Sequence, residues 1–128
     1  MITVLLVDDQ PTMRSGLRMR LELEPDMAVV GEAGDGAAAL ALARETRPDV
    51  IIMDLEMPIM DGFTATAAIR SAVPESAVVV HSLYDDAANQ ARARAAGAVA
   101  FIGKHRLEAP LLAAIRRAGE QHEAQPAH

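Results

Sequence analysis

Short apolar runs alternate with longer amphipathic segments along the 128-residue chain. Each apolar run is four to six residues long and rich in β-branched residues, which is typical of buried β-strands. These runs occupy residues 2–7, 27–30, 50–53, 77–80 and 99–102. Strands that alternate with helical segments indicate βαβ units, in which the strands are parallel.

The other segments carry apolar side chains at helical spacing. Leu17 and Leu21 share one face of the first segment, and Leu111 and Ile115 share one face of the last. The predicted helices span residues 12–24, 37–46, 63–72, 85–96 and 107–119. This pattern predicts one doubly wound α/β domain with a five-stranded parallel sheet over residues 1–119. Residues 120–128 lose the periodicity, so we expect a tail or the start of a linker there.

The composition argues against several classes of function. A formal charge of −6 and an aromatic content of 2% disfavour direct binding of nucleic acid, because phosphate contacts need a clustered basic face. Without cysteine the chain has no disulfide or thiolate site, and its four histidines lack the spacing of a zinc site. No apolar run has membrane-spanning length and the N-terminus lacks the form of a signal peptide, so we expect a cytoplasmic protein without membrane contact.

Polar side chains stand at the ends of four predicted strands. Asp8 and Asp9 follow the first strand, Asp54 follows the third, Ser82 ends the fourth and Lys104 follows the fifth. Ligands of open parallel sheets bind outside the carboxyl ends of the strands, so we expect these groups at one edge. Carboxylates at close range repel one another, and a divalent cation with oxygen ligands, Mg²⁺ or Mn²⁺, would offset that repulsion.

Asp54 is then placed to act as a nucleophile towards phosphorus. A carboxylate that attacks phosphorus forms an acyl phosphate, while a metal, a lysine and a hydroxyl bind the phosphoryl oxygens. Lys104 and Ser82 would supply the last two groups. Singly, these residues have ordinary explanations, since an acidic pair after a strand is often a helix N-cap and a serine is often a turn former. Their arrival at one edge favours the chemical interpretation.

Four motifs in this order resemble the receiver domains of two-component response regulators. They are VLLVDDQPTMRSGL, RPDVIIMDLEMPIMDG, VVVHSLYDD and AAGAVAFIGK, and the resemblance runs from residue 2 to about 119. The stretch LELEPDMAVVGEAGDGAAALALA is most similar to the NarL/FixJ (LuxR-type) group. The resemblance implies a flavodoxin-like receiver fold with strand order 2-1-3-4-5.

The resemblance also implies roles for the acidic residues. Asp54 would be the phosphoacceptor, and Asp8, Asp9 and Asp54 would bind Mg²⁺ with the backbone carbonyl of Glu56. A carboxylate at Glu56, two positions after the phosphoacceptor, would also modulate the lifetime of the phosphoryl group.

The resemblance implies further roles for residues at and after the fourth and fifth predicted strands. Ser82 would be the switch hydroxyl, Phe101 the switch aromatic and Lys104 the phosphate-binding lysine. Phe101 stands where Tyr is frequent and lacks the hydroxyl, so it would report the position of Ser82 through packing alone. Tyr84 is a second modulator position, and the loop that carries Met57 would shape the pocket and expose that side chain to partners.

Two histidines depart from the family pattern. His105 follows Lys104 where many receivers have proline. His81 falls where the fourth strand is normally apolar, and strand alternation directs it away from the site if Ser82 points towards it. A semi-buried structural histidine is favoured over a pH sensor at this position.

The leading hypothesis is a signalling switch, not an enzyme, that accepts phosphate from a sensor histidine kinase. Homodimerisation on phosphorylation is expected from the family, and DNA would be contacted only through a helix-turn-helix domain outside this chain. The helix at 85–96 has no apolar side chain larger than Ala, so we expect it and the strand 99–102 to move.

Three alternatives remain. One is a stand-alone receiver that acts by protein contact, and another is a pseudo-receiver that serves only as a binding module. The third is a Mg²⁺-dependent phosphohydrolase with an Asp nucleophile, similar to the haloacid-dehalogenase-like enzymes. Their Asp-x-Asp pattern is absent, because the chain reads Asp8-Asp9-Gln10.

Overall fold

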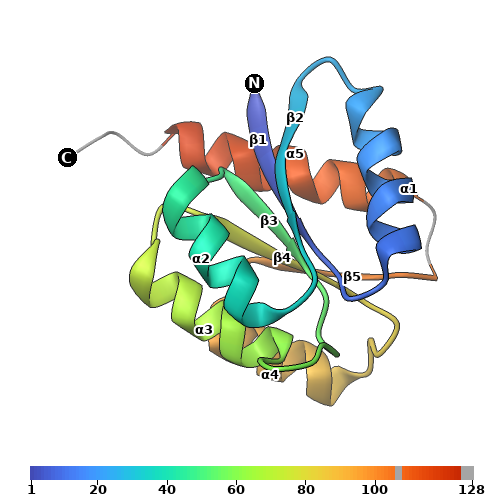
Figure 1. Cartoon of the computed structure of the whole chain (residues 1–128). Coiled ribbons are helices and arrows are strands. Elements are labelled where there is room, and N and C mark those ends of the chain that lie inside the picture. Colours follow the sequence, from blue (N-terminus) through green and yellow to red (C-terminus); the bar gives the residue numbers. More distant parts are fainter. Residues whose placement is uncertain (106–107, 125–128) are drawn as a thin grey trace.

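A computed structural model of the chain describes residues 1–105 and 108–124, and its sheet has five parallel strands. The strands are β1 (Ile2–Val7), β2 (Met27–Ala33), β3 (Val50–Met53), β4 (Ala77–Ser82) and β5 (Ala100–Gly103). Their order is β2-β1-β3-β4-β5, which confirms the predicted doubly wound arrangement (Figure 1).

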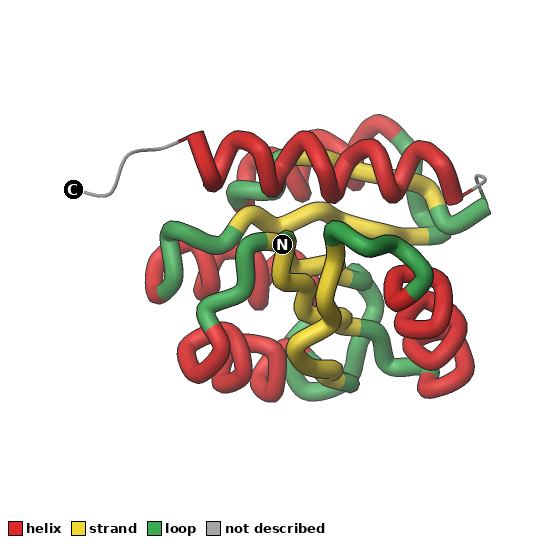
Figure 2. The backbone as a smooth tube through the Cα atoms, turned by 90° about the horizontal axis from the view of Figure 1, so that it is seen from above, coloured by secondary structure: helices red, strands yellow, loops and turns green. Residues whose placement is uncertain are grey.

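Five helices cover the sheet on both sides. They are α1 (Pro11–Glu22), α2 (Gly36–Thr46), α3 (Gly62–Ala72), α4 (Ala87–Ala96) and α5 (Glu108–Ala124). Figure 2, seen from above, shows the strands between helices that lie on opposite sides. No helix among the described residues is long and apolar enough to cross a membrane.

Strand alternation divides the core into two apolar clusters. Leu5 and Val7 of β1 face the cluster that includes side chains of α2, α3 and α4. Val4 and Leu6 face the other cluster, with side chains of α1 and α5. Since successive residues of a strand point to opposite faces, a fully buried strand reads as a continuous apolar run, as predicted for β1 and β3.

The strand bounds agree with the prediction at β1 and β3 and differ elsewhere. β2 continues three residues beyond position 30, because pairing with β1 persists to Ala33 after a register shift between Val4 and Leu5. β4 continues through His81 to Ser82, and β5 begins one residue later than predicted.

The helix bounds also differ from the prediction, and side-chain capping accounts for two of the differences. α2 and α3 begin one residue early, because the side chains of Asp35 and Asp61 accept hydrogen bonds from backbone N–H groups in their first turns. α1 starts at Pro11 and ends at Glu22, two residues before the predicted end, and α4 starts two residues late at Ala87.

The last helix is longer than predicted. α5 reaches Ala124, so residues 120–124 are helical although they lack apolar periodicity. A helix that already packs on the sheet can continue into solvent through residues of good propensity such as Glu and Gln. Leu107, the predicted first residue of this helix, and residues 125–128 lie outside the described part. The domain boundary after residue 119 stays a prediction.

Candidate functional site

Three carboxylates meet at the carboxyl ends of β1 and β3. One oxygen each from Asp8, Asp9 and Asp54 lies within 4.8 Å of the other two. Asp8 and Asp54 are buried, whereas Asp9 is exposed. Within residues 1–105 and 108–124, no other group of three or more acidic, histidine or cysteine side chains has such a geometry. The expected gathering of these carboxylates at one edge is therefore confirmed.

Lys104 stands between two of these carboxylates. Its Nζ lies 2.7 Å from Asp8 Oδ2 and 3.3 Å from Asp54 Oδ1, and its side chain is 6% exposed. Burial lowers the pKa of the ammonium, but the hydrogen bond to Asp8 and the charge of Asp54 outweigh it and raise the pKa overall. The lysine is therefore charged, and it lies where an anion bonded to Asp54 could reach it.

Asp54 has the most perturbed carboxyl group of the site. Its pKa is raised to about 6, chiefly by burial; Lys104 opposes this rise and Asp8 adds to it. Its Oδ1 also accepts a hydrogen bond from the backbone N–H of Leu55, at 2.9 Å. A cation among the three carboxylates would favour the ionised form, because it would offset both the repulsion and the loss of solvation.

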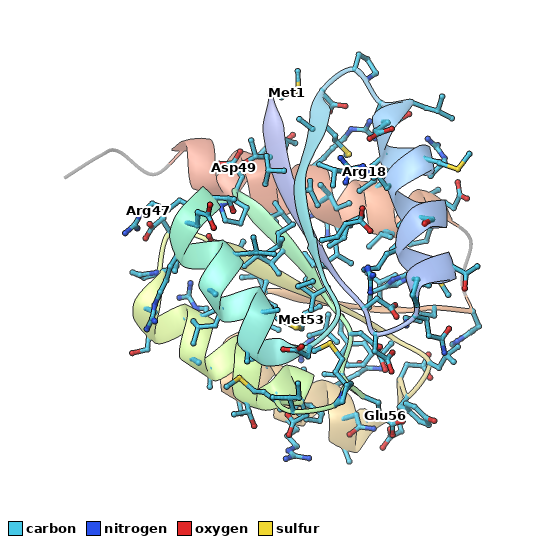
Figure 3. The ribbon with its side chains drawn as sticks, viewed as in Figure 1. Met1, Arg18, Arg47, Asp49, Met53 and Glu56 are labelled. Atoms are coloured by element: carbon cyan, nitrogen blue, oxygen red, sulfur yellow. The ribbon has the colours of Figure 1, made fainter. Side chains whose placement is uncertain are left out.

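The donor set fits a hard divalent cation. Three carboxylates with no nitrogen or sulfur donor suit Mg²⁺ or Mn²⁺, and waters would complete the octahedron. Glu56, in the loop after β3, is exposed, so its backbone carbonyl as a further ligand stays a prediction. Figure 3 shows Met53 at the end of β3 and Glu56 farther along the same loop.

Ser82 lies at the same strand edge and is fully buried. In the β4–β5 register it pairs with Gly103, and its carbonyl accepts a hydrogen bond from Lys104 N at 2.8 Å. Its Oγ accepts a hydrogen bond from Tyr84 N at 3.0 Å. Because Oγ is the acceptor in this hydrogen bond, the hydroxyl proton of Ser82 can be donated to another group.

Phe101 and the predicted modulators lie on the α3 and α4 side of the sheet. Phe101 and Met57 are partly buried against the core cluster there, so Met57 is less exposed than expected. A cavity of about 390 Å³ brings Glu56, Met57 and Tyr84 together. Arg92 borders it too, with its guanidinium 4.1 Å from the centre of the Phe63 ring. The cavity thus borders the loop that follows Asp54.

His81 lies on the other side of the sheet. It is 8% exposed and borders a cavity of about 530 Å³ together with Leu17 of α1 and Leu111 of α5. Nδ1 of His81 has no hydrogen-bond partner among the described residues. Burial, and then the charge of Lys104, lower the pKa of its imidazole to about 4. The ring is thus neutral at neutral pH and points away from the face that Phe101 occupies.

Two contacts near the site were not anticipated from the sequence. Arg14 Nη1 donates to the backbone carbonyl of Asp8 at 2.5 Å. His105 Nε2 lies 3.3 Å from Asp85 Oδ2, which joins the loops after β5 and β4. Both residues were inside or beside quoted motifs, but no pattern of one sequence indicates that a side chain will bond a particular carbonyl or loop.

The chain is similar to one protein family and to curated proteins of two kinds, transcriptional regulatory proteins and protein-glutamate methylesterases. The family model described as response regulator receiver domain matches residues 4–116. The chain is 43% identical to the transcriptional regulatory protein YxjL of Bacillus subtilis over 117 residues, 91% of this chain and 54% of that protein. It is 47% identical to a protein-glutamate methylesterase/protein-glutamine glutaminase of Anaeromyxobacter dehalogenans over 107 residues, 83% of this chain and 31% of that protein. The chain thus spans about half the length of the first relative and about a third of the second.

Solved structures agree with this assignment. The signal receiver domain of the response regulator NarL from Mycobacterium tuberculosis superposes with a TM-score of 0.87 and 37% identity, covering 93% of this chain and 96% of that one. The response regulator domain of Thermotoga maritima CheB superposes with a TM-score of 0.85 and 38% identity, covering 98% of both chains. The family match runs from β1 into α5, and the strand order is the one that the resemblance implied. The chain therefore belongs to the response regulator receiver domain family.

Proposed function

We propose that this domain is a Mg²⁺-dependent phosphorylation switch that accepts a phosphoryl group on Asp54 from a sensor histidine kinase. The observation that carries the proposal is the buried Asp54 carboxylate, which shares Lys104 with Asp8 and lies within 4.8 Å of the Asp8 and Asp9 oxygens. A nucleophile, a metal site and a cation for the phosphoryl oxygens thus converge on one point. A cytoplasmic place of action, where such a kinase domain would meet it, belongs to the proposal.

Each residue has a defined part in the transfer. An oxygen of Asp54 attacks phosphorus, so that an O–P bond forms while the bond from phosphorus to the donor breaks. Asp8 and Asp9, with the Glu56 carbonyl, would hold Mg²⁺, which neutralises charge on the phosphoryl oxygens when bound. Lys104 binds one of these oxygens through its ammonium.

The switch follows from what the added phosphoryl group binds. It brings about −1.5 to −2 charges and strong acceptor oxygens. The Ser82 hydroxyl has a proton to donate, and closing on the phosphoryl group would draw it and the loop of Tyr84 inward. Phe101, which packs on the same side of the sheet, would then repack. The phosphoryl group shifts the equilibrium by its greater affinity for the closed arrangement.

The output is proposed to lie in a longer protein. YxjL and other transcriptional regulators among the relatives support a DNA-binding output domain beyond this chain, with homodimerisation on phosphorylation. The methylesterase relatives support an enzymatic output as the second candidate, since a receiver of similar sequence makes up part of those proteins. A stand-alone receiver that acts by protein contact is the remaining candidate. The coding sequence beyond codon 128 of the gene would distinguish these three candidates.

Intact mass spectrometry tests the proposal. The protein is incubated with Mg²⁺ and acetyl phosphate, beside Asp54→Asn and a sample with excess chelator. We expect a gain of one phosphoryl group in the wild type alone. A gain that persists in Asp54→Asn would place the acceptor elsewhere. No gain in mass with acetyl phosphate, phosphoramidate or a phosphorylated histidine kinase would favour the pseudo-receiver. Release of phosphate from many substrate molecules by each protein molecule would favour a phosphohydrolase.

A further inference from the structure

A guanidinium group fixes the peptide between the two acidic residues that follow β1. Arg14 Nη1 donates to the carbonyl oxygen of Asp8 at 2.5 Å, and that carbonyl belongs to the peptide that joins Asp8 to Asp9. A peptide is planar, so a bond to its oxygen sets the direction in which the next residue leaves. Arg14 lies in the first half of α1, and the helix thus reaches back to the turn from which it starts.

A carboxylate on the neighbouring strand holds Arg14 in this place. Arg14 Nε lies 3.3 Å from Glu32 Oε1, and Glu32 Oε2 accepts a hydrogen bond from Arg18 Nη1 at 2.8 Å. The hydrogen bond from Arg18 is the largest cause of a lowered pKa at Glu32, burial opposes it, and Arg14 adds to the lowering. Glu32 is therefore an anion clamped by two arginines, one turn apart on α1. Figure 3 shows Arg18 on the side of α1 next to β2.

Asp8 itself makes three other hydrogen bonds, one through its backbone and two through its side chain. Asp8 N donates to the Ala33 carbonyl at 3.0 Å, next to Glu32 in β2. Asp8 Oδ1 accepts from Gln10 N at 2.9 Å and Oδ2 accepts from Lys104. Asp9 is exposed, and its backbone nitrogen belongs to the peptide whose oxygen Arg14 binds.

We propose that Arg14 is a positioning residue for the divalent cation: it orients the Asp8–Asp9 peptide so that both carboxylates point towards Asp54. This inference rests on the proposed function, because it concerns the metal on which phosphoryl transfer depends. Arg14 is not among the residues proposed to hold the metal or the phosphoryl group. It acts through the Asp8 carbonyl, and Glu32 keeps its guanidinium in place.

The charge of Arg14 and its proposed positioning role predict opposite changes of Mg²⁺ affinity when the side chain is removed. A cation beside three carboxylates repels Mg²⁺, so loss of its charge alone would tighten Mg²⁺ binding. Loss of a group that orients metal ligands weakens affinity by about 10–100-fold in metal sites. The direction of the change therefore separates the two effects.

The test compares Mg²⁺ affinities by isothermal titration calorimetry for the wild type, Arg14→Gln, Arg14→Lys and Arg20→Gln. We expect about tenfold weaker binding for Arg14→Gln. Arg14→Lys keeps the charge, but one ammonium cannot reproduce the fork that joins Glu32 to Asp8, so weaker binding is expected there too. Arg20→Gln is the matched control: it removes the same charge from α1, where Arg20 pairs with Glu24 and Glu108, and should stay within about twofold of the wild type.

A spectroscopic readout without metal accompanies the calorimetry. The amide nitrogen of Asp9 belongs to the peptide that Arg14 bonds, so its ¹⁵N shift should move in both Arg14 variants and stay in Arg20→Gln. If Arg14→Gln does not fold, Glu32→Gln takes its place, because it loosens the guanidinium and keeps Arg14. It should also weaken Mg²⁺ binding.

Unchanged or tighter Mg²⁺ binding in the Arg14 variants, beside a wild type that binds Mg²⁺ and accepts phosphate, would overturn the positioning role alone. An equal loss in Arg20→Gln would overturn it as well, since the cause would be the stability of α1. A wild type that neither binds Mg²⁺ nor accepts phosphate would overturn the proposed function, and the positioning role with it.

Discussion

Lys104 Nζ lies 3.3 Å from Asp54 Oδ1, and the two side chains are only 6% and 9% exposed. In such a buried pair, removal of one partner leaves the other charge without compensation. At Asp54 the effect of burial exceeds that of the lysine, because burial raises the pKa of this carboxyl to about 6 although Lys104 lowers it. Lys104 thus favours the ionised form of Asp54 in the metal-free protein.

Replacement of Lys104 with Met is expected to raise the pKa of Asp54 further. Loss of an opposite charge at this distance typically moves a carboxyl by about 1–3 units. Carboxyl ¹³C NMR of the metal-free protein measures the titration, and phosphorylation by a small donor at pH 7 should slow in the same variant. An Asp54 pKa that stays at about 6 in the variant would show that the lysine has no such effect.

The raised pKa of Asp54 predicts that Asp54→Asn stabilises the metal-free protein at neutral pH. The unfolded carboxyl has a pKa of about 3.9, whereas the folded one has about 6, so between these values the folded state binds more protons. Stability therefore falls as pH rises from about 4 to about 6, by on the order of 2–3 kcal/mol in total. Asp54→Asn should lack this fall. Urea unfolding at several pH values without Mg²⁺ measures it, and equal slopes in both proteins would contradict the assignment.

His81 predicts a pH dependence of the opposite sign. Burial lowers its pKa to about 4 from an ordinary value of 6.5, so between these values the unfolded state binds more protons. The contribution of neutral His81 to the stability of the fold is therefore complete above about pH 6.5 and is lost as pH falls towards 4. His81→Leu should remove this loss in acid. The same substitution should also add about 1 kcal/mol of stability at pH 7, because Nδ1 is buried and finds no partner in the described part of the chain. If His81→Leu instead destabilised the protein, the imidazole ring would have to make polar contacts that stabilise the fold.

The helix α4 is expected to change when Asp54 is phosphorylated. Ala93 is its only buried residue, so its packing on the sheet is thin. Hydrogen exchange with and without acetyl phosphate should differ in residues 87–96 and in β5, while α2, which buries Gly36, Ala39 and Ala43, serves as the internal control. Equal protection of α4 in both states would remove it as the moving element.

The periodicity of the chain was sufficient to predict a doubly wound domain, whereas the strand order came from the family resemblance. β3 shows this at Val50–Met53, where four apolar residues with 0–2% exposure produce one unbroken run. The end of α5 shows the limit: beyond the sheet edge a helix needs no apolar face, so hydrophobic spacing cannot indicate where it stops. At β2, pairing with β1 extended the strand past the apolar run.

The candidate site was predictable where topology decides and not where individual bonds decide. The carboxyl ends of parallel strands share one edge, which placed Asp8, Asp54 and Lys104 together. The bond from Arg14 to the Asp8 carbonyl depends on side-chain reach across α1 and on the room beside Gly34. A Cβ at Gly34 would come within 3.3 Å of Arg14 Nη1, a constraint that a single sequence does not reveal.

Gly62 gives the sharpest test of the loop that begins at Asp54. A Cβ on Gly62 would lie 2.0 Å from the carbonyl oxygen of Asp54 and 2.7 Å from Leu55 Cα, and both are backbone atoms. Gly62 N also donates to the Leu55 carbonyl at 2.8 Å, which holds the start of α3 against the end of β3. Gly62→Ala must therefore displace the backbone at the site, and we expect a loss of at least about 3 kcal/mol of stability together with lost phosphoryl acceptance.

Gly16 is the matched control for this substitution, because it is also helical. An added Cβ there would meet no other described residue within 4 Å, apart from its chain neighbours and the backbone of its own helix. Gly16→Ala should raise stability by about 0.5–1 kcal/mol, since alanine loses less backbone freedom on entering a helix. Thermal and urea unfolding of the two variants separate the effect of contact from that of helix propensity. If Gly62→Ala were as stable as the wild type, the β3–α3 loop would have another arrangement, and the placement of Asp54 against Leu55 N would have to be revised.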